Sequence, residues 1–185
     1  MPRVLVPLAP GCEEIEAVTI IDLLRRARIE VVAAGLDDQP VTASRGVRLI
    51  PDTTLDEALN REFDMIVLPG GMPGAVNLNN DPRIKNLLGE MAAQGKYTCA
   101  ICAAPFVLGE AGLLAGKSAT SYPGFVDKMN LPGVTYKNDP VVIDGKVITS
   151  RGPGTAMDFA LALIEVLAGK AKREEVEAGL QRPQH

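Results

Sequence analysis

The 185-residue chain contains no tryptophan, and aromatic residues make up only 4% of it. Stacking platforms for single-stranded nucleic acid are therefore scarce. The net charge of −4 disfavours attraction to a phosphate backbone, so we expect no sequence-specific nucleic-acid partner. No apolar run is long enough to span a bilayer, and the first residues lack the pattern of a signal peptide. These absences predict a cytoplasmic protein with no membrane partner.

Histidine and cysteine are scarce as well. The single histidine, His185, is the last residue, so a Ser-His-Asp triad, a Cys-His dyad or a histidine zinc site has no imidazole inside the fold. The three cysteines are too few for a disulfide scaffold, and we expect no metal site. Any nucleophile must therefore be activated by helix dipoles, backbone donors or carboxylates.

The chain does contain a regular alternation of short apolar runs and periodic helical segments. The apolar runs predict buried strands over residues 3–9, 29–36, 63–68, 97–101 and 118–122, with hairpins over 41–51 and 141–150. Helices are predicted over residues 13–28, 52–61, 81–95 and 170–181. Two more are predicted by one end each: one begins at Pro105, and a long one ends at Gly169. This alternation predicts one α/β domain over residues 1–185, a doubly wound and mostly parallel sheet with helices on both faces. The last four residues are expected to be loose.

The chain is organised around residues 96–114, where a strand, a sharp turn and a helix follow one another. Cys102 stands at this corner, just before a helix that begins at Pro105. Unpaired N–H groups and the helix dipole favour a thiolate there, which is the nucleophilic form. We predict a pKa for Cys102 below the usual value of about 8.5. The alternative is a buried cysteine that acts as a small hydrophobic residue.

The other two cysteines have structural interpretations. Cys99 and Cys102 form a C-x-x-C motif, but three strand residues span about 10 Å, whereas a disulfide needs Cα atoms within about 7 Å. We therefore expect no intramolecular disulfide. Cys12 lies in the first strand-to-helix turn, where it either fills space or provides a second oxidisable thiol.

Three glutamates crowd the start of the first predicted helix. For Glu13 and Glu14 we predict simple matching of the helix dipole. Glu16 is a candidate site residue, because it lies near the carboxyl edge of the first strand, where open α/β sheets bind ligands. The apolar residues predicted to face the core are Ile15, Val18, Ile21 and Leu24.

A pair of glycines, Gly70 and Gly71, ends the strand over residues 63–68. Glycines at the end of a buried strand allow close backbone approach and leave N–H groups bare. The pair is suited to an oxyanion hole, and it is equally typical of a tight strand-to-helix turn.

Four segments together resemble the ThiJ/PfpI superfamily. They are GCEEIEAV at residues 11–18, VLPGG at 67–71, AICAAP at 100–105 and TSRGPGTAMDFAL at 149–161. The resemblance runs from about residue 4 to residue 169 and implies a flavodoxin-like fold, usually as a homodimer. It also implies chemistry without a cofactor, since members are described as glyoxalases, as deglycases of methylglyoxal-modified proteins and nucleotides, and as oxidation sensors.

The resemblance implies a site centred on Cys102, the reactive cysteine at a strained elbow. Glu16 matches the carboxylic acid that hydrogen-bonds the sulfur, and Gly71 and Ala103 match the backbone oxyanion donors. The resemblance also implies substrate contacts from Gly70, Tyr122, Arg45 and Arg26. The two arginines match basic residues that in relatives lie near the dimer interface and the site. In one departure, Tyr122 stands where relatives with a Cys-His pair have histidine, and tyrosine is a weak proton shuttle with a pKa of about 10.

Two functions of different classes use these same residues. In the first, the Cys102 thiolate attacks a methylglyoxal-type dicarbonyl or its early protein adduct, and Glu16 moves the protons. In the second, a redox-sensing or chaperone-like protein, Cys102 oxidises to a sulfinate that protonated Glu16 holds. A protease or amidotransferase relative is disfavoured because the fold has no internal histidine.

Overall fold

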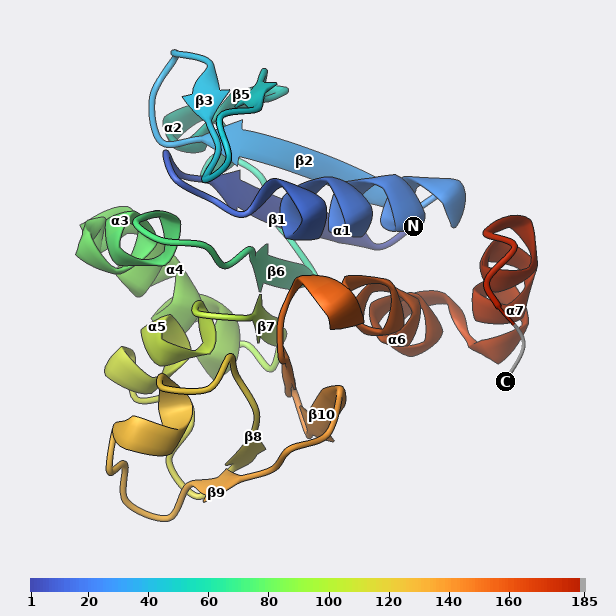
Figure 1. Ribbon diagram of the computed structural model, residues 1–185. Helices are drawn as coiled ribbons and strands as arrows, with labels where there is room; N and C mark the ends of the chain where they lie inside the picture. Colours follow the sequence, from blue (N-terminus) through green and yellow to red (C-terminus); the bar gives the residue numbers. More distant parts are fainter. Residues whose placement is uncertain (184–185) are drawn as a thin grey trace.

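A seven-stranded sheet runs through the computed structural model, which describes residues 1–183 (Figure 1). Its strands lie in the order β10-β11-β7-β6-β1-β2-β5, and every pairing is parallel except that of β10 with β11. Their bounds are β1 Arg3–Leu8, β2 Glu30–Gly35, β5 Thr53–Thr54, β6 Met65–Leu68, β7 Tyr97–Ile101, β10 Val141–Asp144 and β11 Val147–Ser150. The predicted flavodoxin-like, mostly parallel sheet is confirmed.

Helices cover both faces of the sheet, and each face has its own apolar core. One face packs against α1 (Glu14–Arg26) and α6 (Ala156–Ala168), with α7 (Lys170–Gly179) following α6. The other face packs against α2 (Leu55–Ala58), α3 (Gly74–Asn80), α4 (Pro82–Ala93) and α5 (Pro105–Glu110). Strand residues alternate between the cores, as in β7, where Cys99 and Ile101 face α1 and α6 and Ala100 faces the other side.

Short elements surround the main sheet. A hairpin of β3 (Val41–Thr42) and β4 (Arg48–Leu49), and the hairpin of β10 and β11, confirm two predictions. The strand predicted over residues 118–122 is wrong in its extent. Only β8 (Ser118–Ala119) forms, outside the main sheet against β9 (Thr135–Tyr136), because the chain then turns to bond β7 and β11. The remaining elements are two short 3-10 helices, η1 (Val126–Lys128) and η2 (Pro153–Thr155).

The apolar stripe predicted for α1 is wrong at Ile15 and Val18, whereas Leu24 is buried and Ile21 packs partly buried against the core, as predicted. Ile15 is 56% exposed and Val18 is 46% exposed. The buried face consists of Glu14, Glu16, Ala17, Ile20, Leu23 and Leu24. Steps of three residues fall short of a helical turn, so the predicted stripe drifts around the helix, and two buried glutamates mark the true inner face. An apolar stripe therefore faces outward along α1.

The C-terminal region is held by ion pairs up to Arg182, closer to the chain end than predicted. Arg182 contacts Asp158 and Glu177 through its two terminal nitrogens. The expected looseness of the last four residues is therefore wrong for Arg182, and His185 lies outside the described residues. No helix within residues 1–183 combines the length and apolar character that crossing a membrane requires.

Candidate active site

Three loops meet at the carboxyl edge of the sheet, after β1, β6 and β7. This convergence follows from the topology, because parallel neighbouring strands end at the same edge. The first two loops are in close backbone contact, since the Glu13 N–H donates to the Gly70 carbonyl at 2.9 Å. Gly71 has a φ of +88°, and a Cβ there would lie 2.5 Å from the Glu13 nitrogen and 2.7 Å from the Gly11 oxygen. Only glycine fits this contact.

Cys102 occupies a strained elbow between β7 and α5. Its φ of +64° lies in the left-handed region, which is uncommon for a residue other than glycine. Hydrogen bonds from both sides hold the conformation. The Cys102 N–H donates to the Ser150 carbonyl at 3.0 Å, and the Tyr122 N–H donates to the Cys102 carbonyl at 2.7 Å. Strain held in this way is typical of functional positions.

Glu16 lies against this elbow from the inner face of α1. Its side chain is fully buried, and Oε1 accepts a hydrogen bond from the Gly70 N–H at 3.0 Å. A Cβ on Gly70 would lie 2.8 Å from this Oε1 and 2.6 Å from the Cys102 Cβ. The missing side chain of Gly70 thus lets the carboxyl group approach the cysteine. Oε2 is buried and has no hydrogen-bond partner within residues 1–183.

The predicted lowering of the Cys102 pKa is wrong. Burial, followed by the charge of the Glu16 carboxylate and a hydrogen bond to it, raises the pKa of Cys102 to about 12. The N–H groups of Gly71 and Ala103 bond the sulfur and lower the pKa, but by less. The helix that was expected to help, α5, has only six residues, so its dipole is small.

The proton balance of the site depends on Glu16. Burial raises the pKa of Glu16 from 4.5 to about 7, against the lowering effects of Cys102 and the Gly70 N–H. A surface glutamate is fully ionised at neutral pH, whereas Glu16 can hold or release a proton there. The thiol and the carboxyl group therefore form a coupled pair, in which ionisation of one opposes ionisation of the other.

Cys12 and Cys99 are less accessible than Cys102. All three cysteines are free thiols, and Cys102 is 8% exposed, against 1% for Cys12 and 0% for Cys99. Burial raises the pKa of Cys99, and burial together with the charges of nearby glutamates raises the pKa of Cys12 to about 12. Accessibility, rather than a low pKa, distinguishes Cys102.

Both glutamates that were predicted to match the helix dipole, Glu13 and Glu14, have specific structural roles. Glu13 is the N-cap of α1, and its carboxylate accepts the Glu16 N–H at 2.8 Å. Glu14 is buried and holds the β3–β4 hairpin. It accepts the Ser44 hydroxyl at 3.0 Å, the Arg45 N–H at 2.9 Å and the Val47 N–H at 3.3 Å. Dipole matching is therefore the wrong explanation for Glu14.

We expect Glu14→Gln to lower the free energy of unfolding by about 1–3 kcal/mol, because the glutamine NH₂ group would face the part-buried N–H donors of Arg45 and Val47. Burial raises the Glu14 pKa, but hydrogen bonds to the carboxylate lower it more. The contribution of Glu14 to stability is therefore present above the ordinary glutamate pKa and lost as the pH falls through the lowered value. Urea unfolding at several pH values measures both effects. Exposed Glu110→Gln is the control, and an equal loss in both variants would contradict the assignment.

The predicted arginines are not both brought to the site in one chain. Arg45 lies on the tip of the β3–β4 hairpin, beside the first loop, since the Ser44 N–H donates to the Cys12 carbonyl at 2.7 Å. Arg26 lies at the far end of α1 and pairs with Asp22. Tyr122 is beside Cys102 through its backbone, and its side chain is 50% exposed.

Sequence reasoning missed Arg151. This residue follows Ser150 at the end of β11, in register with the Cys102 corner of β7. The signal available in the sequence was the glycine-rich segment RGPGT directly after a buried strand.

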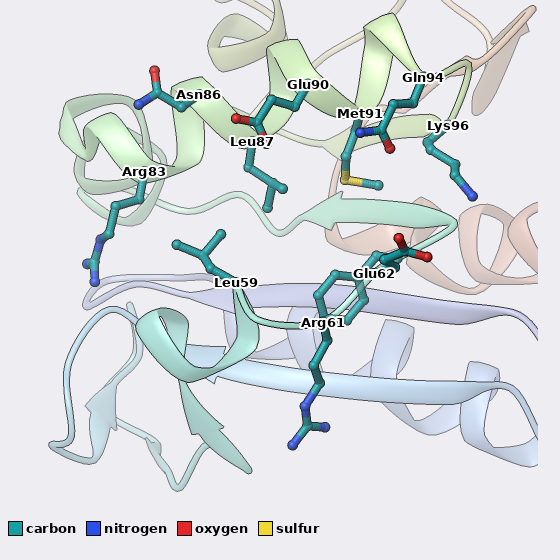
Figure 2. Close-up of a pocket in the computed structure, with 11 residues that line it drawn as sticks. Leu59, Arg61, Glu62, Arg83, Asn86, Leu87, Glu90, Met91, Gln94 and Lys96 are labelled. Carbon is teal, nitrogen blue, oxygen red and sulfur yellow. The ribbon is translucent and has the colours of Figure 1, made fainter.

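A cavity lies away from these candidate site residues (Figure 2). Its volume is about 580 Å³, and it opens between α4 and the segment that joins α2 to β6. Two of its cations already have carboxylate partners, since Arg83 binds Asp81 and Asp56 and Lys96 binds Asp64. None of the predicted site residues lines this cavity. In the part of the chain from 1 to 183, no group of three potential ligands is arranged to hold a metal ion.

A mostly parallel α/β sheet with a cysteine at a strained elbow and a buried glutamate beside it defines the class of this protein. The model of the DJ-1/PfpI family matches residues 2–166. The chain belongs to this family, which confirms the resemblance predicted from the four sequence segments.

Relatives match along nearly the whole chain. Protein dj-1beta of Drosophila melanogaster is 46% identical over 178 residues, 95% of both chains, and its crystal structure gives a TM-score of 0.93 at 44% identity over 99% of both chains. Glutathione-independent glyoxalase DJR-1.2 of Caenorhabditis elegans is 42% identical and covers 86% of this chain and 85% of that protein. A structure of oxidized Toxoplasma gondii DJ-1 gives a TM-score of 0.93 at 41% identity, covering 100% of both chains. The chain spans only 45% and 39% of two Arabidopsis thaliana DJ-1 homologues.

Proposed function

We propose that this protein is a cysteine-dependent glyoxalase or deglycase that needs no cofactor and acts on methylglyoxal-type dicarbonyls or their early protein adducts. The observation that carries the proposal is the coupled pair of Cys102 and Glu16. The pKa of Glu16, about 7, suits proton transfer at neutral pH. The relative named as a glutathione-independent glyoxalase supports the same reaction class.

The reaction begins with transfer of the Cys102 proton to the Glu16 carboxylate and attack of the sulfur on the aldehyde carbon. The new S–C bond leaves an oxyanion, for which the N–H groups of Gly71 and Ala103, which bond the sulfur in the free protein, are the proposed donors. Glu16 returns its proton to this oxygen and then, as a carboxylate, removes the hydrogen from the former aldehyde carbon. Delivery of that proton to the neighbouring carbon, together with transfer of the hydroxyl proton to the former ketone oxygen through Glu16, gives a thioester of lactate. Hydrolysis of the thioester by water releases lactate and the thiol.

Lactate formation from methylglyoxal by purified protein tests the proposal. The Cys102→Ser variant is the matched control, because it removes the nucleophile with one atom changed. Turnover that is equal in both proteins, or absent from the wild type, would overturn the proposal.

We also propose that the protein is a homodimer that forms through α1. The exposed Ile15 and Val18 share one face of the helix with Asp22 and Arg26, which follow at helical spacing. In a two-fold antiparallel contact, this face would place Arg26 of the partner subunit beside Ile15, at the end of α1 nearest to Glu16. This arrangement would bring the predicted Arg26 to the site.

Light scattering checks the dimer. We expect a particle of twice the chain mass of 19.6 kDa. Val18→Glu should convert it to a single chain, because a charge in an apolar contact is strongly unfavourable. A wild-type protein that remains a single chain at micromolar concentration would contradict the contact.

Redox sensing is the second candidate function. One observation favours it, namely the solved structure of a relative described as oxidized. In this function peroxide oxidises Cys102 to a sulfinate, which protonated Glu16 stabilises by a hydrogen bond. Both functions predict modification at Cys102, but only the glyoxalase forms lactate.

A further inference from the structure

A smaller cavity, of about 180 Å³, adjoins the Cys102 corner. It is lined by Tyr122, Pro123, Arg151, Gly152, Pro153, Gly154 and Thr155. Both of its walls are tied to Cys102, one by the 2.7 Å hydrogen bond from Tyr122 and the other by the 3.0 Å bond to Ser150, the residue before Arg151. The walls are also in contact with each other, since a Cβ on Gly152 would lie 3.3 Å from the Tyr122 ring. The cavity is therefore a direct neighbour of the reactive cysteine.

Among the described residues, Arg151 is the only charged one that lines this cavity. Its Nε is buried and has no hydrogen-bond partner within residues 1–183. By contrast, Arg83 and Arg182 each contact two carboxylates. A buried donor without an acceptor is costly, so an acceptor from outside the chain would be bound favourably here.

The position of Arg151 relates it to the reacting carbon. Ser150 pairs with Ile101 in the parallel ladder of β11 and β7, so Arg151 and Cys102 are the next residues of neighbouring strands. Neighbouring strands lie about 4.8 Å apart. The backbones of Arg151 and Cys102 are therefore adjacent, and the subsite requires a ligand in which a short carbon chain joins the carboxylate to the electrophilic carbon.

We propose that this cavity is an anion subsite in which Arg151 binds the carboxylate of a molecule whose electrophilic carbon reacts with Cys102. The guanidinium group binds carboxylates through two parallel hydrogen bonds, and the Tyr122 ring forms a wall for the connecting carbons. A volume of about 180 Å³ is below that of pockets for whole ligands and suits one terminal group. The subsite rests on the proposed function only for the choice of an aldehyde as the natural electrophile. It predicts a preference for carboxylated over neutral aldehydes.

Alkylation of Cys102 by iodoacetate and iodoacetamide tests the subsite without requiring turnover. In both reactions the thiolate forms an S–C bond as iodide leaves, and only iodoacetate carries a carboxylate. Both rates are proportional to the same thiolate fraction of Cys102, so this fraction cancels when the iodoacetate rate is divided by the iodoacetamide rate. We expect Arg151→Gln to lower the iodoacetate-to-iodoacetamide ratio by about 10-fold, because a charge-assisted hydrogen bond is lost. Arg151→Lys should give an intermediate ratio.

Arg61→Gln is the control, because it removes the same charge from the distant cavity of Figure 2. An equal ratio in Arg151→Gln and Arg61→Gln would overturn the subsite. The wild type provides a second measurement, in which the Cys102 ratio of the folded protein should exceed that of the urea-unfolded chain by about 10-fold. Equal ratios in the two states would also overturn it. Failure of the proposed function is distinct, since it would appear as absent lactate formation with the folded ratio still high.

Discussion

We expect Glu16→Gln to lower methylglyoxal turnover by about 10²-fold or more, which is the usual contribution of a positioned acid–base group. Glutamine keeps the shape of the side chain and can still bond the Gly70 N–H through its carbonyl oxygen. It cannot exchange a proton with the sulfur or with the substrate carbons. Cys102 should therefore remain open to alkylation while lactate formation is lost.

Stability measurements separate this chemical role from a structural one. Because burial raises the folded pKa of Glu16 from 4.5 to about 7, its favourable contribution is present at low pH and lost as the pH rises through about 7. Glu16→Gln should remove this pH dependence, so the variant gains stability relative to the wild type as the pH increases. Exposed Glu90→Gln serves as the control. Wild-type turnover in Glu16→Gln would refute the assignment of the proton carrier.

The second large effect is expected for Gly70→Ala. The added Cβ would lie 2.6 Å from the Cys102 Cβ, 2.7 Å from the Ile101 carbonyl oxygen and 2.8 Å from Glu16 Oε1. The Ile101 oxygen belongs to the backbone and cannot rotate away. We therefore expect a loss of about 2–4 kcal/mol in the free energy of unfolding, together with the loss of Cys102 alkylation by iodoacetamide at its wild-type rate.

Gly89→Ala is a sharp control for this substitution. Gly89 lies on the exposed side of α4, and within residues 1–183 no atom beyond its chain neighbours and the adjacent helix backbone lies within 4 Å of the Cβ that alanine would add. Alanine should stabilise the helix there by about 0.5–1 kcal/mol. Urea unfolding measures both variants. Equal stability of Gly70→Ala and the wild type would show that the close contact between β6, β7 and α1 is not rigid.

Local patterns were sufficient for much of the fold and for the convergence of Cys102 and Gly70 at one edge of the sheet. Buried apolar runs indicated the main strands, and two strand ends indicated Cys102 and the Gly70–Gly71 pair. The role of Glu14 could not be predicted in this way, since Ser44 and Val47 lie about 30 residues away. Helix α3 was missed because it begins at a glycine without a side-chain cap.

The sign of the Cys102 pKa shift was mispredicted for a related reason. A helix start is visible in the sequence, whereas the depth of burial depends on core residues that are distant in the chain. Desolvation then outweighs the dipole. The outward stripe of Ile15 and Val18 was misassigned because spacing alone does not show which side of a helix meets the sheet.

The two edges of the sheet restrict how copies of the chain can polymerise. One edge strand, β5, has only two residues. The other, β10, ends at Asp144, whose carboxylate accepts the Ser118 N–H at 2.8 Å and draws β8 beside it. Neither edge offers a long open ladder to a strand from another molecule. Growth into cross-β fibres by strand addition is therefore hindered while the fold is intact, and the two-fold contact proposed for α1 would end at a closed pair of chains.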